Sequence, residues 1–557
     1  MLAASRVVTL PTMVGNSATA GPVGRARSAA GTCGEAIVRL LEQYGVDTVF
    51  GIPGVHTLEV YRGLSHSTIR HVLARHEQGA GFMADGYGRV RGEPGVCAVI
   101  SGPGVTNVLT PVAQAYHDSR PLLVLSGAVG TADRGRDRGA LHDLPDQQAL
   151  MAQVTAFSHT VADPGELPSL LARAWEIFTC GRPRPVHIEI PVDVFSAPAP
   201  AVDRIESTCR PPVPSPESVH AAAAMLWTAA KPAILLGGGA AHAGAEAVRL
   251  AERIGAPIGL TIGAKGAVSS SNLLCLGATL TFQPARELIC EADVLLAVGT
   301  QFSHSDWWEL DGAPQPKGSL IRADIDESQL HNLLPASLAL LGDSAATLGA
   351  ITAALPCENP QPDRIALGAR RARAAIRSLR FPPEVSDYAD FIETLDAALP
   401  HDRIVVGDST QPVYAANHLM AAPQPRSWLM PIGYGTLGCA LPMAVGAKLG
   451  APSRPVVCIA GDGGVLFTLQ ELATAKDLRM SLPVIVWSNG GYGEIRDAME
   501  KARISPFATD AQAHDLVQIA SGFGCRAERL TEVSGLGPLV REALESRGPT
   551  LIEVCLR

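Results

Sequence analysis

The stretch VVCIAGDGG, residues 456–464, joins a continuous apolar run to a glycine-rich turn that carries one carboxylate, Asp462. A second stretch, VIVWSNGG at residues 484–491, has the same arrangement, with the amide of Asn489 after its apolar run. Such apolar runs are typical of strands buried on both faces, and therefore of parallel sheets covered by helices. Because ligands bind at the carboxyl ends of such strands, we expect Asp462 and Asn489 to share a site there.

The side chains of this predicted site favour a metal ion and a phosphate group. Carboxylate and amide oxygens are hard ligands that suit Mg²⁺. The glycines Gly461, Gly463 and Gly464 let backbone N–H groups approach a diphosphate, and the following helix adds its positive N-terminal end. A lone GDG sequence is also an ordinary turn, so the prediction depends on the pair, in which Asn489 follows Asp462 by 27 residues.

Similar apolar runs alternate with amphipathic segments along the rest of the chain. We predict strands at residues 96–100, 122–125 and 186–190, at 233–236, 294–298 and 320–325, and at 404–406, 456–460 and 484–487. Two proline-rich stretches, 197–216 and 356–383, are interpreted as linkers. The prediction is an α/β protein with three doubly wound parallel-sheet domains, at residues 31–196, 217–355 and 384–557, after a flexible extension at 1–30. The first and third segments have similar layouts without a recognisable sequence repeat.

Composition restricts the class of protein further. A chain of 557 residues is too long for one hydrophobic core, and its net charge of −9 without a basic block argues against nucleic acid as a partner. The 11 cysteines are dispersed and form no CxxC pair, which is typical of reduced thiols in the cytoplasm. No apolar run approaches the ~20 residues that span a bilayer, so no membrane segment is expected.

The spacing of GDG and Asn resembles the fingerprint of thiamine-diphosphate (ThDP) enzymes of the acetolactate synthase and pyruvate decarboxylase type. The resemblance implies a pyrimidine-binding, a central Rossmann-like and a diphosphate-binding domain, and a third Mg²⁺ ligand in the carbonyl of Gly491. The segment RHEQGA, residues 75–80, is similar to the family element whose glutamate, here Glu77, contacts the aminopyrimidine ring. Such a glutamate promotes loss of a proton from the cofactor. The alternative role of Glu77 is that of a helix N-terminal acid.

Further segments resemble loops around the same cofactor. In GYGTLG, residues 433–438, the family pattern implies that the carbonyl of Gly435 accepts a hydrogen bond from the cofactor and that Leu437 separates its two rings. Leu437 could instead be an ordinary core residue. Gln411 matches a glutamine of the diphosphate loop. The family binds its cofactor across a subunit interface, which implies a homodimer or homotetramer.

The reaction depends on how the carbon that has lost CO₂ is used. If this carbon takes up a proton, the product is an aldehyde and the enzyme is a 2-oxo acid decarboxylase. If it adds to a second oxo acid, the enzyme is a carboligase of the acetolactate synthase type. His142, in the loop where acetolactate synthases carry Phe-Gln, and His117 are candidate proton donors, although either could be a structural histidine. A non-catalytic ThDP-binding homologue is a further alternative. FAD is not expected, because residues 299–302 lack the arginine that holds it in acetolactate synthases.

The substrate is indicated only by similarity to a narrower group. Residues 50–59, 75–89 and 425–438 are similar to bacterial 5-guanidino-2-oxopentanoate (2-ketoarginine) decarboxylases. Asp306 and Trp307 could bind a guanidinium group by pairing and stacking. The alternative for both residues is a surface loop that packs onto the sheet.

Overall fold

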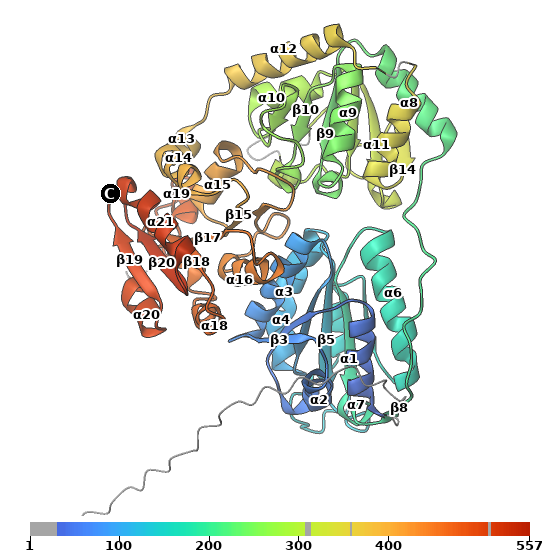
Figure 1. Ribbon diagram of the computed structural model, residues 1–557, viewed down its shortest axis with the longest axis vertical. Helices are drawn as coiled ribbons and strands as arrows, with labels where there is room; N and C mark the ends of the chain where they lie inside the picture. Colours follow the sequence, from blue (N-terminus) through green and yellow to red (C-terminus); the bar gives the residue numbers. More distant parts are fainter. Residues whose placement is uncertain (1–30, 307–313, 357–358, 511–513, 557) are drawn as a thin grey trace, which may run out of the picture.

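The computed structural model describes residues 31–306, 314–356, 359–510 and 514–556. These residues form three six-stranded sheets, all of whose neighbouring strands are parallel, and helices cover the sheets (Figure 1). The predicted α/β class with three doubly wound domains is therefore confirmed. Each apolar run predicted as a strand overlaps a strand of one of these sheets. The expected extension at residues 1–30 lies outside the described residues.

The N-terminal domain has the sheet order β3-β2-β4-β5-β7-β6. Its strands are β2 (Thr48–Gly51), β3 (Arg70–Leu73), β4 (Gly95–Val99), β5 (Leu122–Ala128), β6 (Phe157–Thr160) and β7 (Val186–Pro191). Its helices are α1 (Cys33–Gln43), α2 (Leu58–Ser65), α3 (Glu77–Arg91), α4 (Pro103–His117), α5 (Gln147–Ala152), α6 (Leu167–Cys180) and α7 (Val192–Phe195). Two short strands, β1 (Gly31–Thr32) and β8 (Pro198–Ala199), pair antiparallel and join the start of the domain to its end.

The middle domain has the sheet order β11-β10-β9-β12-β13-β14. Its strands are β9 (Pro232–Leu236), β10 (Ile258–Leu260), β11 (Cys275–Gly277), β12 (Val294–Val298), β13 (Ser319–Asp324) and β14 (Leu338–Leu341). Its helices are α8 (Pro216–Thr228), α9 (Gly244–Ile254), α10 (Gln283–Cys290), α11 (Ser344–Ala353) and α12 (Pro362–Ser378). With the strands numbered within the domain the order is 3-2-1-4-5-6, which is that of dinucleotide-binding folds.

The C-terminal domain has the sheet order β16-β15-β17-β18-β20-β19. Its strands are β15 (Ile404–Gly407), β16 (Trp428–Leu429), β17 (Val456–Gly461), β18 (Leu482–Trp487), β19 (Arg526–Leu530) and β20 (Pro549–Val554). Its helices are α13 (Pro383–Ser386), α14 (Ala389–Ala398), α15 (Gln411–Leu419), α16 (Ala440–Gly450), α17 (Asp462–Val465), α18 (Glu471–Asp477), α19 (Gly493–Lys501), α20 (Leu516–Gly522) and α21 (Leu536–Glu545). Numbered within each domain, both terminal sheets have the order 2-1-3-4-6-5.

The two predicted linkers have different outcomes. Residues 200–215 contain no helix or strand, as expected for a linker. The second prediction is wrong over most of its length, because α12 (Pro362–Ser378) is a helix that packs against α9 and α10 of the middle domain. Its small residues Gly368, Ala369 and Ala372 are buried in this contact. The small size of these apolar side chains explains why the helix resembled a linker in the sequence.

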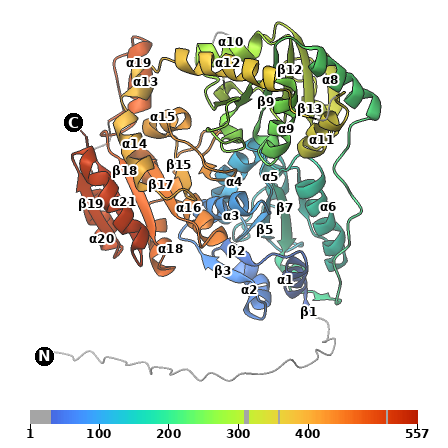
Figure 2. The same cartoon turned by 45° about the horizontal axis from the view of Figure 1, so that its top comes forward.

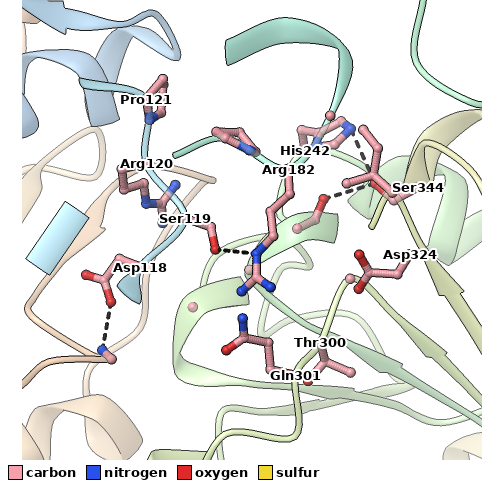
Figure 3. Close-up of a pocket in the computed structure, with 18 of the residues that line it drawn as sticks. Asp118, Ser119, Arg120, Pro121, Arg182, His242, Thr300, Gln301, Asp324 and Ser344 are labelled. Atoms are coloured by element: carbon pink, nitrogen blue, oxygen red, sulfur yellow. Dashed lines mark hydrogen bonds between the residues drawn. The ribbon is translucent and has the colours of Figure 1, made fainter. Parts of the chain in front are cut away.

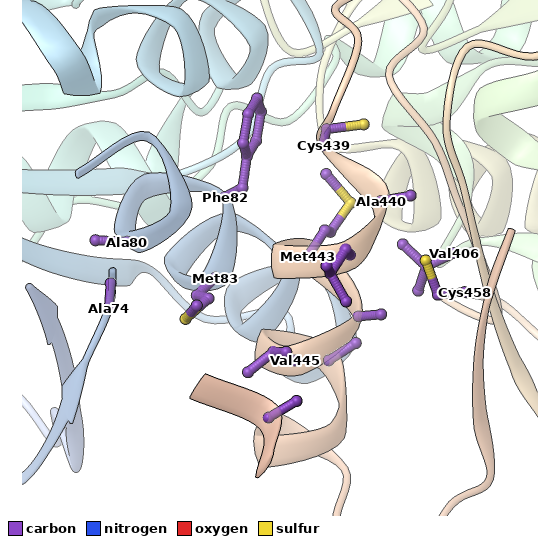
Figure 4. Close-up of a cluster of buried hydrophobic side chains, with 14 of the residues drawn as sticks. Ala74, Ala80, Phe82, Met83, Val406, Cys439, Ala440, Met443, Val445 and Cys458 are labelled. Carbon is purple, nitrogen blue, oxygen red and sulfur yellow. The ribbon is translucent and has the colours of Figure 1, made fainter. Parts of the chain in front are cut away.

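The N-terminal and C-terminal domains pack together through α3 and α16 (Figures 1 and 4). A Cβ atom on Gly86 would lie 2.1 Å from the carbonyl oxygen of Met443, and one on Gly446 would lie 1.9 Å from that of Met83. Glycine at both positions therefore allows the two helix backbones to touch. Phe82, Met83 and Met443 belong to the hydrophobic core that spans both domains. Since α3 begins at Glu77, this contact fixes the position of Glu77 relative to the C-terminal domain.

The middle domain contacts both of its neighbours (Figure 2). Lys265 donates a hydrogen bond to the carbonyl oxygen of Ala416 and lies over the Trp428 ring in the C-terminal domain. Arg182 of the N-terminal domain pairs with Asp326 of the middle domain at 3.4 Å. Within the ranges described, no helix is both long enough and apolar enough to cross a membrane.

Candidate active site

The predicted metal ligands lie together at the carboxyl edge of the C-terminal sheet. Asp462 follows β17 and Asn489 follows the adjacent strand β18. The Asp462 carboxylate accepts hydrogen bonds from the backbone N–H groups of Gly490 and Gly491, at 2.8 and 3.1 Å. The side-chain oxygen of Asn489 is buried and has no hydrogen-bond partner. A buried oxygen without a partner costs free energy, so this edge has an acceptor that suits a cation.

Gln411 is hydrogen-bonded to the same turn. It begins α15, and its side-chain oxygen accepts hydrogen bonds from Tyr388 at 3.0 Å and from the Asn489 amide at 3.3 Å. Its own amide donates to Asp497 at 2.6 Å. These bonds orient the Asn489 side chain so that its oxygen, rather than its amide nitrogen, is the atom left without a partner.

Close packing and positive φ values both favour glycine in these turns. A Cβ atom on Gly463 would lie 2.9 Å from the Tyr492 ring, and Gly464 is in contact range of Leu437. Gly435, Gly490 and Gly491 have φ values of 66°, 83° and 143°, which favour glycine. The sequence therefore needs glycine at these turns for the backbone conformation and for close packing.

Asp408 holds the loop that contains Gly435 and Leu437. It follows β15 and is buried, and its carboxylate accepts hydrogen bonds from the N–H groups of Ser409 and Gly438. Burial raises the pKa of Asp408 to about 6. At its other end the same loop is bound by the N-terminal domain, since Asp118 accepts a hydrogen bond from the Gly433 N–H at 2.7 Å.

Glu77 lies at the carboxyl edge of the N-terminal sheet, as the first residue of α3. The Asn107 amide, in α4, donates a hydrogen bond to the Glu77 carboxylate at 2.9 Å. His76 caps the helix by accepting a hydrogen bond from the Gln78 N–H. Glu77 is therefore a helix N-terminal acid, as the alternative interpretation proposed, and its side chain is also oriented by a specific partner.

A buried carboxylate from the C-terminal domain supports this helix end. Glu471, at the start of α18, has 0% exposure and accepts hydrogen bonds from the backbone N–H groups of Arg75 and His76, each at 3.1 Å. Thr474 donates a further hydrogen bond to it at 2.6 Å. A Cβ atom on Gly79 would lie 2.2 Å from the Glu471 carboxylate. Glu471 thus fixes the turn immediately before Glu77.

The two candidate histidines lie at opposite ends of α4. His142 packs on Gly102, the residue before the helix, where a Cβ atom would lie 2.6 Å from the His142 carbonyl oxygen. His117 is the last residue of α4, and its ring stacks on Tyr434 with centroids 4.9 Å apart. At 1.5 Å per residue, the helix separates the backbone of His117 from that of Asn107 by about 15 Å. His142, rather than His117, therefore shares the helix end that carries the partner of Glu77.

A cavity of about 450 Å³ lies between the N-terminal and middle domains (Figure 3). His117 and Asp306 both line it, together with the basic residues Arg120 and Arg182. Asp306 has 6% exposure, so the surface-loop interpretation is wrong for this residue, and its carboxylate accepts a hydrogen bond from the Ile262 N–H at 3.2 Å. Burial raises the pKa of Asp306 to about 7. Trp307 lies outside the described residues.

Sequence reasoning missed several residues of the two edges. His56 lies in segment 50–59, Ser101 follows β4 and Asn107 lies in α4, but no motif considered in the sequence selects these side chains. Asp408 and Glu471 are single buried acids whose partners are backbone groups far away in the chain. A polar residue within two positions of a strand end was the available signal for Ser101 and Asp408.

Comparison with known proteins assigns the fold and the two edges to one family. Residues 31–150 match the N-terminal TPP-binding domain of thiamine pyrophosphate enzymes, residues 219–351 match the central domain and residues 406–554 match the C-terminal TPP-binding domain. The chain therefore belongs to the thiamine pyrophosphate (ThDP) enzyme family. Its two cofactor-binding domains are those that carry Glu77 and Asp462.

Individual relatives cover almost the whole chain. A probable 2-ketoarginine decarboxylase, AruI of Pseudomonas aeruginosa, is 47% identical over 94% of both chains. The large subunit of acetolactate synthase isozyme 1 of Escherichia coli is 33% identical, over 94% of this chain and 93% of its own. The acetolactate synthase large subunit IlvB1 of Mycobacterium tuberculosis is 34% identical, over 90% of this chain and 84% of its own.

Proposed function

We propose that this protein is a ThDP- and Mg²⁺-dependent decarboxylase that converts a 2-oxo acid into an aldehyde and CO₂ without oxidation. The observation that carries the proposal is the position of His142 at the N-terminal end of α4, the helix whose Asn107 binds Glu77. An imidazole there can supply the proton that aldehyde formation requires. The 47% identity to a probable 2-ketoarginine decarboxylase supports the same reaction.

The residues of the C-terminal edge fit the metal and the diphosphate. Asp462, the unpartnered oxygen of Asn489 and the carbonyl of Gly491 would hold Mg²⁺, and the turn 461–464 would hold the diphosphate. When bound, ThDP supplies a carbon nucleophile and stabilises the electron pair that remains after CO₂ leaves. Gly435 and Leu437, on the loop held by Asp408, would contact the two rings.

Glu77 has the role of holding a proton at its carboxylate beside the pyrimidine ring. Asn107 donates to one carboxylate oxygen, at 2.9 Å, so the other oxygen is the one available for the cofactor. His142 then supplies a proton at the substrate carbon. In the overall reaction, one 2-oxo acid anion and one proton are converted into one aldehyde and one CO₂.

We further propose that two copies of the chain complete each site. Within one chain, Glu77 is bonded to Asn107 and Asp462 to the turn 490–491, so each half has its own partners. Large apolar side chains are exposed on both halves: Leu58, Leu73 and Leu141 in the N-terminal domain, and Phe467, Ile495 and Phe507 in the C-terminal domain. Exposed apolar surface of this kind favours association. Sedimentation should show a dimer or tetramer, and a monomer that is fully active would contradict this arrangement.

The candidate substrate is 5-guanidino-2-oxopentanoate, by similarity to the Pseudomonas relative. The test is a panel of 2-oxo acids, including pyruvate and the guanidino acid, with CO₂ release and product identity measured in the presence of ThDP and Mg²⁺. Aldehyde as the main product would support decarboxylation. Acetolactate or another condensation product would favour the second candidate, a carboligase, for which the acetolactate synthases at 33–34% identity are the supporting observation. Absence of any turnover would favour a non-catalytic ThDP-binding homologue.

A further inference from the structure

Two imidazoles that are distant in the sequence lie next to each other in the N-terminal domain. The His56 and His142 rings have centroids 5.4 Å apart and meet edge to face, at 69°. His56 follows β2, in the short 3₁₀ turn Val55–Thr57, and His142 lies in the connection between β5 and α5. Since β2, β4 and β5 are parallel and follow one another in the sheet, their carboxyl ends bring these loops to the edge that carries Glu77.

His56 is held by a hydroxyl group from the turn that follows β4, the strand that lies between β2 and β5. Its Nδ1 shares a hydrogen bond of 2.5 Å with Ser101 Oγ, and Ser101 has 0% exposure. The backbone of His56 also packs on the end of β5, where a Cβ atom on Gly127 would lie 2.7 Å from the His56 carbonyl oxygen. Because Nδ1 is occupied by Ser101, the other ring nitrogen, Nε2, is free to exchange a proton.

His142 has a backbone conformation that a non-glycine residue rarely adopts. Its φ is 65°, and its main chain lies against Gly102, where any side chain would clash. Left-handed backbone at such a residue is strained and persists where the surroundings impose it, often at functional sites. His142 Nδ1 is buried without a hydrogen-bond partner. The structure therefore fixes an imidazole with one nitrogen unoccupied, beside a second imidazole.

The pair has the charge properties needed for proton transfer. Burial, and secondarily the neighbouring His142, lower the pKa of His56. Two imidazolium ions this close repel each other, which favours release of a proton from a doubly charged pair. A pair with one proton can deliver it and then be recharged, which a single buried histidine does less readily.

We propose that His56 and His142 form a proton relay that serves the aldehyde-forming step, an inference that rests on the proposed decarboxylation. His142 donates its N–H proton to the carbon that has lost CO₂, so that an N–H bond breaks and a C–H bond forms. His56 then returns a proton from its Nε2 to His142 and takes one from solvent, which supplies the single proton consumed in each turnover. His56 acts through His142 and is a positioning and proton-supplying residue.

The test separates protonation from the loss of CO₂. Hexacyanoferrate(III) oxidises the same electron-rich carbon by two electrons, with two equivalents reduced per substrate, and yields a carboxylate without needing the proton from His142. His56→Gln should lower aldehyde formation about 10- to 100-fold, at the lower end of what a positioned acid–base group supplies. The rate coupled to hexacyanoferrate(III) should stay within about twofold of the unmodified protein, because the steps up to CO₂ release do not use the relay.

Two further variants test whether the effect of His56→Gln is specific to the relay. Ser101→Ala, which removes only the hydroxyl that orients His56, should lower aldehyde formation by a smaller factor and leave the oxidant-coupled rate unchanged. His159→Gln is the matched control: His159 is a partly buried histidine of the same domain, on the edge strand β6, and is hydrogen-bonded to Glu166 at 2.7 Å. Both of its rates should match those of the unmodified protein.

The outcomes distinguish the relay from the proposed function. Equal loss of both rates in His56→Gln would overturn the relay and assign His56 to support of the fold or of substrate binding. Unchanged aldehyde formation would also overturn it. If the unmodified protein forms condensation products and no aldehyde, or shows no turnover, the proposed function fails and the relay fails with it.

Discussion

The N-terminal and C-terminal domains have the same strand order but carry different chemistry at the same edge. The N-terminal edge carries Glu77 and two imidazoles, whereas the C-terminal edge carries the Asp462 carboxylate, the Asn489 amide and glycine turns. The first set suits proton transfer and the second suits binding of a metal and a diphosphate. The strand order of a parallel sheet thus determines where side chains lie, whereas the loops after its strands determine which chemistry they can perform.

The largest effect is expected at the C-terminal edge. Asp462→Ala removes the carboxylate that we propose as a Mg²⁺ ligand and the acceptor of the Gly490 and Gly491 N–H groups, so the protein should lose ThDP retention and all measurable activity. Calorimetric titration with ThDP in excess Mg²⁺ measures this directly. In the unmodified protein, ThDP and Mg²⁺ should raise the unfolding temperature, because they bind only the folded state. Unchanged ThDP affinity in the variant would break the assignment of anchoring to this edge.

A change at the N-terminal edge should affect turnover rather than binding. Glu77→Gln keeps the size of the side chain and an oxygen that can accept from Asn107, so ThDP affinity should remain close to that of the unmodified protein. Turnover should fall about 10²–10⁴-fold, the usual contribution of a positioned acid–base group. Turnover should therefore fall in both variants, whereas ThDP affinity should be lost only in Asp462→Ala. Normal turnover in Glu77→Gln would remove the distinction between the edges.

A change at Asp306 of the middle domain tests whether substrate recognition is separate from the chemistry of the two edges. If a guanidinium group binds Asp306, Asp306→Asn should lower kcat/KM for 5-guanidino-2-oxopentanoate by about 1.5–3 kcal/mol, which is roughly 10- to 150-fold. The neutral 2-oxohexanoate, of similar length, should be almost unaffected. Equal losses on both substrates would assign Asp306 to the support of Ile262 and of the cavity wall.

The smallest effect is expected at Glu471, which connects the C-terminal domain to the turn before Glu77. Glu471→Ala leaves the Arg75 and His76 N–H groups without their acceptor. Each unpaired N–H group costs about 1–3 kcal/mol of stability, so the temperature of the first unfolding transition should fall. Through displacement of Glu77, kcat should fall about tenfold while ThDP affinity changes little. Glu471→Gln keeps an acceptor oxygen and should restore most of the kcat. An effect on ThDP affinity instead would show that Glu471 serves the C-terminal edge.

The sequence by itself determined the fold class, the three sheets and both cofactor-binding segments. Asp462 and Asn489 could be selected because each follows an apolar strand within a short motif, and Glu77 because the segment RHEQGA resembles a family element; such local patterns are encoded by neighbouring residues. The sequence misread α12 as a linker, because small apolar residues give a weak helical pattern until the sheet beside them is known.

Only the tertiary structure decided which side chains lie together. The order of the parallel strands brought His56 next to His142, and the length of α4 placed His117 at its far end. Domain packing brought Glu471 to the turn before Glu77, although Glu471 is 396 residues from Arg75 in the chain. The physical reason is that contacts between loops depend on strand order and on helix packing, which no single motif contains. The local chemistry of each residue was visible in the sequence, but its partners were set by the order of the strands and by the contact between α3 and α16.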